Sequence, residues 1–126
     1  MMKLTLTVMA EELAVSRLNK DAEIPSWPLS SQFFSITRTK DELSIVSLTE
    51  DVPADIKSEK NWRALKVEGP LDFSMVGVLS FLATTLAQEG ISIFVISTYD
   101  TDYLLVKEES LEEAIEVLSK DYIINN

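Results

Sequence analysis

Apolar and polar residues alternate over Lys3–Val8, whose sequence is KLTLTV. Successive side chains of a strand point to opposite faces, so a period of two predicts a strand with one buried face. The run ISIFVIS at Ile91–Ser97 is almost continuously β-branched or aromatic, which predicts a central strand that is covered on at least one face. The same reasoning predicts strands over Phe33–Arg38, Leu43–Leu48, Arg63–Glu68, Tyr103–Val106 and Tyr122–Ile124.

A helical period follows the turn at Gly69-Pro70. Its apolar residues lie four, three and four positions apart, so they share one face of a helix: Met75, Leu79, Leu82 and Leu86. Asp72 or Ser74 is predicted to accept hydrogen bonds from the first free amides of this helix. Gly90 is predicted to end it, because glycine adopts the left-handed conformation of a helix C-terminus without strain.

A second helix is predicted to begin near Ser110. Ser110 and Glu113 have the Ser-x-x-Glu spacing of a capping box. A short helix is also predicted over Glu11–Leu18, and the prolines around Trp27 predict an ordered loop over Ala22–Ser31. The apolar residues that recur with helical spacing after Ser110 are Leu111, Ala114, Ile115 and Leu118.

The second half of the chain therefore has the element order β-α-β-β-α-β. This order predicts an α/β (α+β) sandwich, in which helices cover one face of an antiparallel sheet. A shift of sixty residues places Phe34 on Phe94, Ile36 on Ile96 and Glu42 on Asp102. The match predicts two repeats, residues 1–60 and 61–126, of which the first is degenerate. Open sheet edges favour association, so a homodimer is expected.

The net charge of the chain limits the classes of partner that it is expected to bind. The 126 residues carry a net charge of −10, from 21 acidic and 11 basic side chains. This charge repels nucleic-acid phosphates and anionic lipids, and no basic cluster reverses it locally, so neither partner is expected. No apolar run approaches the roughly 20 residues that span a bilayer. Met1–Ala10 lacks the pattern of a signal peptide, so we expect a cytoplasmic protein without a membrane anchor.

The chain contains no cysteine and no histidine. It therefore lacks thiolate nucleophiles, the commonest general base at neutral pH and the commonest transition-metal ligand. The acidic pair Asp100 and Asp102 lacks the further spaced oxygen ligands and the glycine of a calcium loop. No other group of residues predicts chemistry, so we expect a protein that is not an enzyme and holds no cofactor or metal.

Two segments, DFSMVGVL at Asp72–Leu79 and LAQEGI at Leu86–Ile91, resemble the signature of the ACT domain family. In that signature a polar loop, often with a Pro-Gly pair, enters a leucine-bearing helix that ends at a Gly-Ile step. Gly77 and Gly90 occupy the two glycine positions, and Val76 stands in place of the usual proline. The segments IPSW, FFSITRT, ELSIVSL, WRALKVEGP and STYDTDYLLV resemble short, free-standing proteins with two ACT-like repeats. Those proteins are similar to the repeats of cytosolic arginine sensors.

The resemblance implies a ferredoxin-like fold and a regulatory protein that binds a small ligand, an amino acid, at an interface between ACT units. Helix-start amides bind a carboxylate well, and the turn after Ser97 carries acidic groups suited to an ammonium group. Carried over by position, the ligand-binding residues are Asp72, Phe73, Ser74, Met75, Val76, Gly77, Val78, Thr98, Tyr99 and Asp102.

Each of these polar residues also has a structural interpretation. Asp72 or Ser74 can fill the helix-start amides itself. Asp100 and Thr98 are residue types that a tight turn recruits for its own backbone, and for Asp102 both roles stay open. The alternative function is accordingly an ACT domain without a ligand, which acts as an adaptor and binds protein.

Overall fold

The computed structural model describes residues 4–68 and 77–126. Contacts divide the chain into two compact units. The N-terminal unit is Glu11–Trp62, and the C-terminal unit joins Met1–Ala10 to Arg63–Asn126. A linear boundary between two repeats does not describe this division, because the first ten residues pack with the C-terminal unit. The two-repeat organisation stays a prediction.

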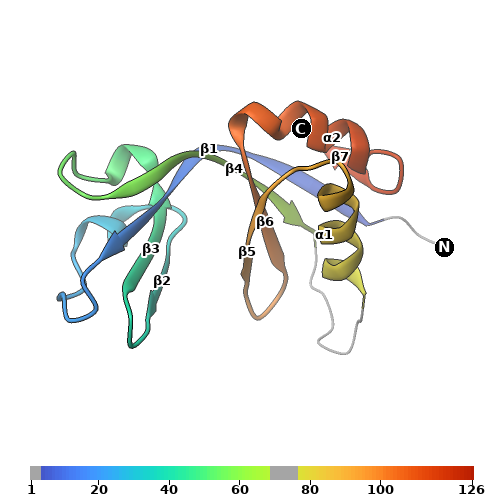
Figure 1. The fold of residues 1–126 in the computed structure, drawn as a ribbon. Coiled ribbons are helices and arrows are strands. Elements are labelled where there is room, and N and C mark those ends of the chain that lie inside the picture. Colours follow the sequence, from blue (N-terminus) through green and yellow to red (C-terminus); the bar gives the residue numbers. More distant parts are fainter. Residues whose placement is uncertain (1–3, 69–76) are drawn as a thin grey trace. The chain divides into compact units, whose positions relative to one another are not determined.

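The C-terminal unit has the predicted order β-α-β-β-α-β (Figure 1). This confirms the α+β class and the number of elements after Asn61. The amphipathic segments form the helices, and the alternating or β-branched segments form the strands. The elements are β4 (Ser58–Val67), α1 (Val78–Gln88), β5 (Ile93–Ser97), β6 (Asp102–Lys107), α2 (Leu111–Leu118) and β7 (Ile123–Asn125).

A strand from the start of the chain completes the sheet of this unit. The first part of β1 (Thr5–Leu18) lies between β7 and β4, and β6 and β5 follow in that order. Thr5–Thr7 pairs in parallel with Ile123–Asn125. On the other side, the Glu68 amide donates to the Thr5 carbonyl at 2.8 Å. The first part of β1 therefore belongs to this unit because strands of the unit bond its main chain on both sides.

Both helices cover the same face of this sheet. Strand side chains that share one face by alternation pack with the apolar stripes of α1 and α2 in a single core. This confirms the predicted arrangement of helices on one face. The buried members of the core are Leu6, Leu65, Val67, Leu82, Leu86, Ile91, Leu104, Val106, Ala114, Leu118 and Tyr122.

The strands of the N-terminal unit pair in an antiparallel arrangement within the same sheet. Strand β2 (Ser35–Arg38) pairs with β3 (Leu43–Leu48), and β3 pairs with the second part of β1. The hairpin was predicted from the sequence, and β3 has the predicted bounds. The 3-10 turn η1 (Trp27–Ser30) lies in the predicted proline loop and contacts β3. A second 3-10 turn, η2, spans Thr49–Asp51.

The helix predicted over Glu11–Leu18 is wrong, because these residues continue β1. Leu13–Leu18 pairs residue by residue with Leu43–Leu48. The adjacent side chains of Leu13 and Ala14 are both fully buried, so both faces of the strand are covered here. Long-range pairing and burial thus override a local composition that favours a helix.

The position predicted for Ile91–Ser97 is also wrong. The strand there, β5, pairs with β6 and forms the edge of the sheet. Its Ile93 and Val95 side chains pack against the core, while the strand as a whole is only half-buried. A β-branched run indicates a strand and a partly covered face, but it carries no information about which neighbour pairs with it.

Both predicted helix starts need correction. Helix α1 begins at Val78 with Gly77 as its N-cap, and Asp72 and Ser74, which were predicted to accept from its first amides, lie outside the described residues. Helix α2 begins at Leu111, but the Ser110 side chain makes no capping hydrogen bond. The 3-10 turn η3 (Glu108–Ser110) runs directly into α2. Ser110 is therefore already helical, with φ −102° and ψ −1°, rather than extended as a capping residue usually is.

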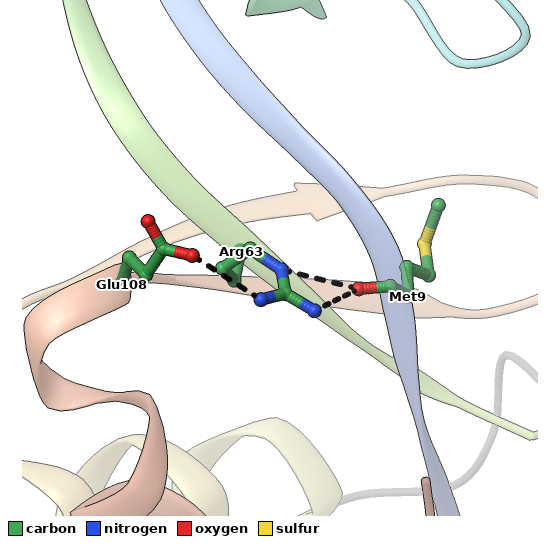
Figure 2. A network of polar contacts seen from close by, with 3 residues as sticks. All are labelled: Met9, Arg63 and Glu108. Carbon is green, nitrogen blue, oxygen red and sulfur yellow. Dashed lines mark hydrogen bonds and ion pairs between the residues drawn. The ribbon is translucent and has the colours of Figure 1, made fainter.

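Arg63 joins three elements of the C-terminal unit (Figure 2). Its Nε and Nη2 donate to the Met9 carbonyl at 3.3 and 2.9 Å, and its Nη1 lies 3.5 Å from Glu108 Oε1. The guanidinium thus binds β1 from β4 and reaches the start of η3. Because its side chain is only 18% exposed, the bonds to the carbonyl lie in a partly desolvated place.

Candidate functional site

The turn between β5 and β6 is held by threonine rather than glycine. The Thr98 amide donates to the Thr101 carbonyl at 2.8 Å, and the Thr101 amide donates to Thr98 Oγ1 at 3.3 Å. Thr98 Oγ1 in turn donates to the Thr101 carbonyl at 3.1 Å. Among the described residues, only Asn61, Gly77 and Gly90 have a positive φ, so this turn is not of the left-handed hairpin types.

These bonds favour the structural interpretation of Thr98. Its hydroxyl closes the turn, although it was carried over as a ligand-binding residue. Tyr99 at the tip has 81% of its surface exposed, and Asp100 is exposed beside it. The Asp102 carboxylate accepts a hydrogen bond from Ser97 Oγ at 2.5 Å, across a pair of facing strand residues. Asp102 therefore has one carboxylate oxygen held by the protein.

Thr101 connects this turn to a different strand. Its Oγ1 donates to the Val67 carbonyl at 2.5 Å, and Val67 is the last residue of β4. Thr101 is 5% exposed although Thr98, Tyr99 and Asp100 are all exposed. The bond fixes the turn at the end of β4, from which the chain runs on to the start of α1.

Helix α1 begins after a glycine with a left-handed backbone. Gly77 has φ 87°, and a Cβ built on it would have no atom within 4 Å. The first helical bond runs from the Phe81 amide to the Gly77 carbonyl at 2.9 Å. The amides that precede Phe81 in α1 have no acceptor within the helix, and the helix dipole makes this end partly positive. A negatively charged group fits here, beside the exposed Gly77 and the half-buried Val78.

The two predicted parts of the site lie at the same end of the C-terminal unit. Figure 1 shows the β5–β6 turn and the first turn of α1 at its lower end. The Thr101–Val67 bond joins the turn to the end of β4. Asp72, Phe73, Ser74, Met75 and Val76 lie outside the described residues.

Sequence reasoning missed a cavity of about 210 Å³ in the N-terminal unit. Glu11 and Glu12 line it from β1, Leu48 from the end of β3 and Glu50 from η2. This cavity was not predicted from the sequence because Glu11 and Glu12 were assigned to a helix. Their place in β1, next to the segment that pairs with β3, brings these residues to the same cavity as Leu48 and Glu50.

Among the described residues, the side chain whose pKa is clearly shifted is that of a buried tyrosine, Tyr122. Burial, and then the neighbouring Asp121 carboxylate, raise the pKa of Tyr122. Its ring packs against Phe81 with the ring centroids 6.0 Å apart.

Within residues 4–68 and 77–126, no group of three or more acidic side chains is arranged to hold a metal ion. No helix in these ranges is long and apolar enough to cross a membrane.

The sequence matches the model of the ACT domain over residues 57–120. The chain belongs to the ACT domain family. The match confirms the predicted family and covers β4 through α2, including the β5–β6 turn and the described start of α1. A second model, of an N-terminal domain, matches residues 11–55 and so falls within the N-terminal unit.

This ACT protein is similar to a human protein named cytosolic arginine sensor for mTORC1 subunit 1. The two are 34% identical over 101 residues, which cover 74% of this chain and 31% of the human protein. The chain therefore spans about a third of the length of that relative. The name of that relative describes it as an arginine sensor.

Solved structures show the same fold over the whole chain. A crystal structure from Agrobacterium tumefaciens has a TM-score of 0.91 and 34% identity, and it covers 98% of this chain and 93% of that one. The regulatory subunit of aspartate kinase from Thermus thermophilus, in its ligand-free form, has a TM-score of 0.61 and 10% identity. That comparison covers 93% of this chain and 94% of the subunit, and at this identity it shows the fold alone.

Proposed function

We propose that this ACT protein is a non-catalytic, cytoplasmic sensor that binds a free amino acid. The observation that carries the proposal is the ACT match over residues 57–120 together with 34% identity to a protein named as an arginine sensor. Arginine is accordingly the first ligand to test. The acidic balance of the chain suits a ligand with a cationic side chain.

The proposed ligand lies at the open end of the C-terminal unit. Its carboxylate accepts hydrogen bonds from the amides at the start of α1, where Gly77 allows close approach. An ammonium or guanidinium group of the ligand donates to Asp102, whose other oxygen is already held by Ser97. Tyr99 and Val78 supply apolar surface beside these polar groups, and the residues carried over from Asp72–Val76 remain part of the proposal.

Regulation follows from a shift between two packings of the protein. We propose a homodimer in which the ligand lies between ACT units and favours one packing over the other. A ligand shifts such an equilibrium only by its difference in affinity for the two states. A site shared between units provides this difference, because one of its halves moves away when the packing changes.

A melting screen of the whole chain against each of the twenty amino acids tests the proposal. A ligand at one hundred times its dissociation constant adds about 2.7 kcal/mol to the free energy of unfolding, which raises the melting temperature measurably. We expect arginine or another single amino acid to do so, and its D-enantiomer to have a smaller effect. Flat curves with all twenty contradict the sensor and favour an adaptor that binds protein.

The site is tested separately with matched carboxylate variants. Asp102→Asn removes the proposed cation acceptor and is expected to abolish most of the ligand-induced shift. Glu42→Gln makes the same chemical change sixty residues earlier, in the β2–β3 hairpin, and is expected to leave the shift intact. Equal shifts in both variants contradict the proposed site. Sedimentation of the same samples gives the mass, and a monomer that still binds the ligand contradicts the homodimer alone.

A further inference from the structure

We infer that Thr101 is a positioning residue for the proposed ligand site, because it anchors the acidic β5–β6 turn to the end of β4. This inference rests on the proposed function and adds a residue that the resemblance did not carry over. Thr98, Tyr99 and Asp102 were expected to contact the ligand. Thr101 acts through them.

The burial of Thr101 is the first reason. A residue in a hairpin turn is usually exposed, since turns run over the surface. Here Tyr99 is 81% exposed, while Thr101, two residues later, is 5% exposed. Its side chain is thus directed into the protein, although the other residues of the turn are exposed.

The bond to Val67 is the second reason. Thr101 Oγ1 donates to the Val67 carbonyl at 2.5 Å, across 34 residues of sequence. Val67 is fully buried and ends β4. A buried carbonyl needs a donor, and here the side chain of the turn supplies one. Loss of the hydroxyl therefore frees the turn and leaves the end of β4 without this bond.

The third reason is how Thr101 is joined to Asp102. The main chain of Thr101 accepts a bond from the Thr98 amide at 2.8 Å and donates to Thr98 Oγ1 at 3.3 Å, so it closes the turn from both sides. Asp102 follows directly and is held by Ser97. The Thr101 hydroxyl therefore adds a bond between the turn and β4 to the pairing of β6 with β4, directly beside Asp102.

Two pairs of variants isolate the hydroxyl. Thr101→Val keeps the branched shape and loses the donor, and Thr101→Ser keeps the donor and loses a methyl group. Thr101→Ala, compared with Thr101→Ser, repeats the test in a smaller side chain in case the valine variant does not fold. Thr37→Val is the control, because it makes the same change at an exposed position of β2.

Calorimetric titration uses the amino acid that stabilises the wild-type protein in the melting screen, at a temperature where all variants are folded. We expect Thr101→Val and Thr101→Ala to weaken binding by about tenfold, equivalent to about 1.4 kcal/mol. Thr101→Ser and Thr37→Val are expected to bind within about threefold of the wild type. A purely structural hydroxyl would lower the melting temperature and leave the affinity unchanged, and that result overturns the inference.

Amide hydrogen exchange gives a readout without ligand. We expect faster exchange at the Thr98 and Thr101 amides in Thr101→Val than in Thr101→Ser or Thr37→Val. Unchanged exchange overturns the anchoring role even if binding is weakened. If the wild type binds no amino acid, the proposed function fails and the role of Thr101 in binding fails with it. If the wild type binds and the variants bind equally well, only the present inference fails.

Discussion

The strands of the two units are covered in different ways. In the C-terminal unit, α1 and α2 pack on one face, and Leu82, Leu86 and Leu118 are fully buried there. The N-terminal unit has no α-helix between Glu11 and Trp62. Its proline-containing turn η1 contacts β3 instead. Similar hairpins can therefore be covered by a helix or by a short loop, and the segment between the strands decides which.

The difference bears on where a ligand can bind. A helix entrance supplies unpaired amides and a partial positive charge, and a 3-10 turn of a few residues does not. The C-terminal unit has such an entrance at Gly77, close to the end at which the acidic turn lies. The N-terminal unit has an acidic cavity but no helix start. The two units are therefore not equivalent as binding modules.

The largest expected effect comes from breaking the helical cover of the C-terminal unit. Leu86→Ala removes a fully buried side chain from α1, so we expect a loss of about 2–5 kcal/mol in the free energy of unfolding. Leu29→Ala in the N-terminal unit is the control, because Leu29 is 56% exposed and its loss is expected to change stability by less than about 0.5 kcal/mol. Urea unfolding measures both. Equal losses would contradict the assignment of the main core to the helical face.

The predictable parts of the fold are those that local pattern determines. Strand β3, the hairpin that contains it and the helix after Ser110 were predicted, because alternation and helical spacing are visible within a few residues. The continuation of β1 through Glu11–Leu18 was not, because it depends on pairing with β3 some thirty residues later. The edge position of β5 depends in the same way on which strands pair, and its own sequence does not specify that.

The candidate site likewise has parts that the local sequence predicts and parts that depend on distant contacts. The acidic turn and the glycine at the helix entrance were identified from residue types, and both lie in the C-terminal unit. Thr101 was not identified, because its role depends on the Val67 carbonyl, which is distant in sequence. Gly77 was expected inside the helix. It is the N-cap instead, because its left-handed backbone, with φ 87°, is not that of an α-helix.

A second contrast concerns the residues with left-handed backbone. The C-terminal unit uses Gly90, with φ 72°, and the N-terminal unit uses Asn61, with φ 68°. A Cβ on Gly90 would have no atom within 4 Å, so Gly90→Ala is expected to cost only the backbone strain of about 1–2 kcal/mol. Gly90→Asn should cost less, because asparagine tolerates this conformation. Asn61→Gly should cause no comparable loss, and thermal unfolding of the three variants checks the order.

A loss in Gly90→Asn as large as that in Gly90→Ala would contradict the backbone explanation. It would indicate instead that the end of α1 does not accommodate a side chain. Asn61 is the internal reference, because it is an asparagine that already has this left-handed backbone.

The smallest expected effect tests the polar contacts at Arg63 (Figure 2). Glu108 is 52% exposed and lies 3.5 Å from Arg63, so Glu108→Gln is expected to cost about 0.2–1 kcal/mol at low salt and almost nothing at about 1 M salt. Glu109→Gln removes the same charge one residue later, and it controls for the general gain from reducing the negative charge of the chain. The difference between the two variants in urea unfolding is the measured quantity. A difference that persists in high salt would contradict a screened ion pair as its source, since salt weakens only the charge interaction.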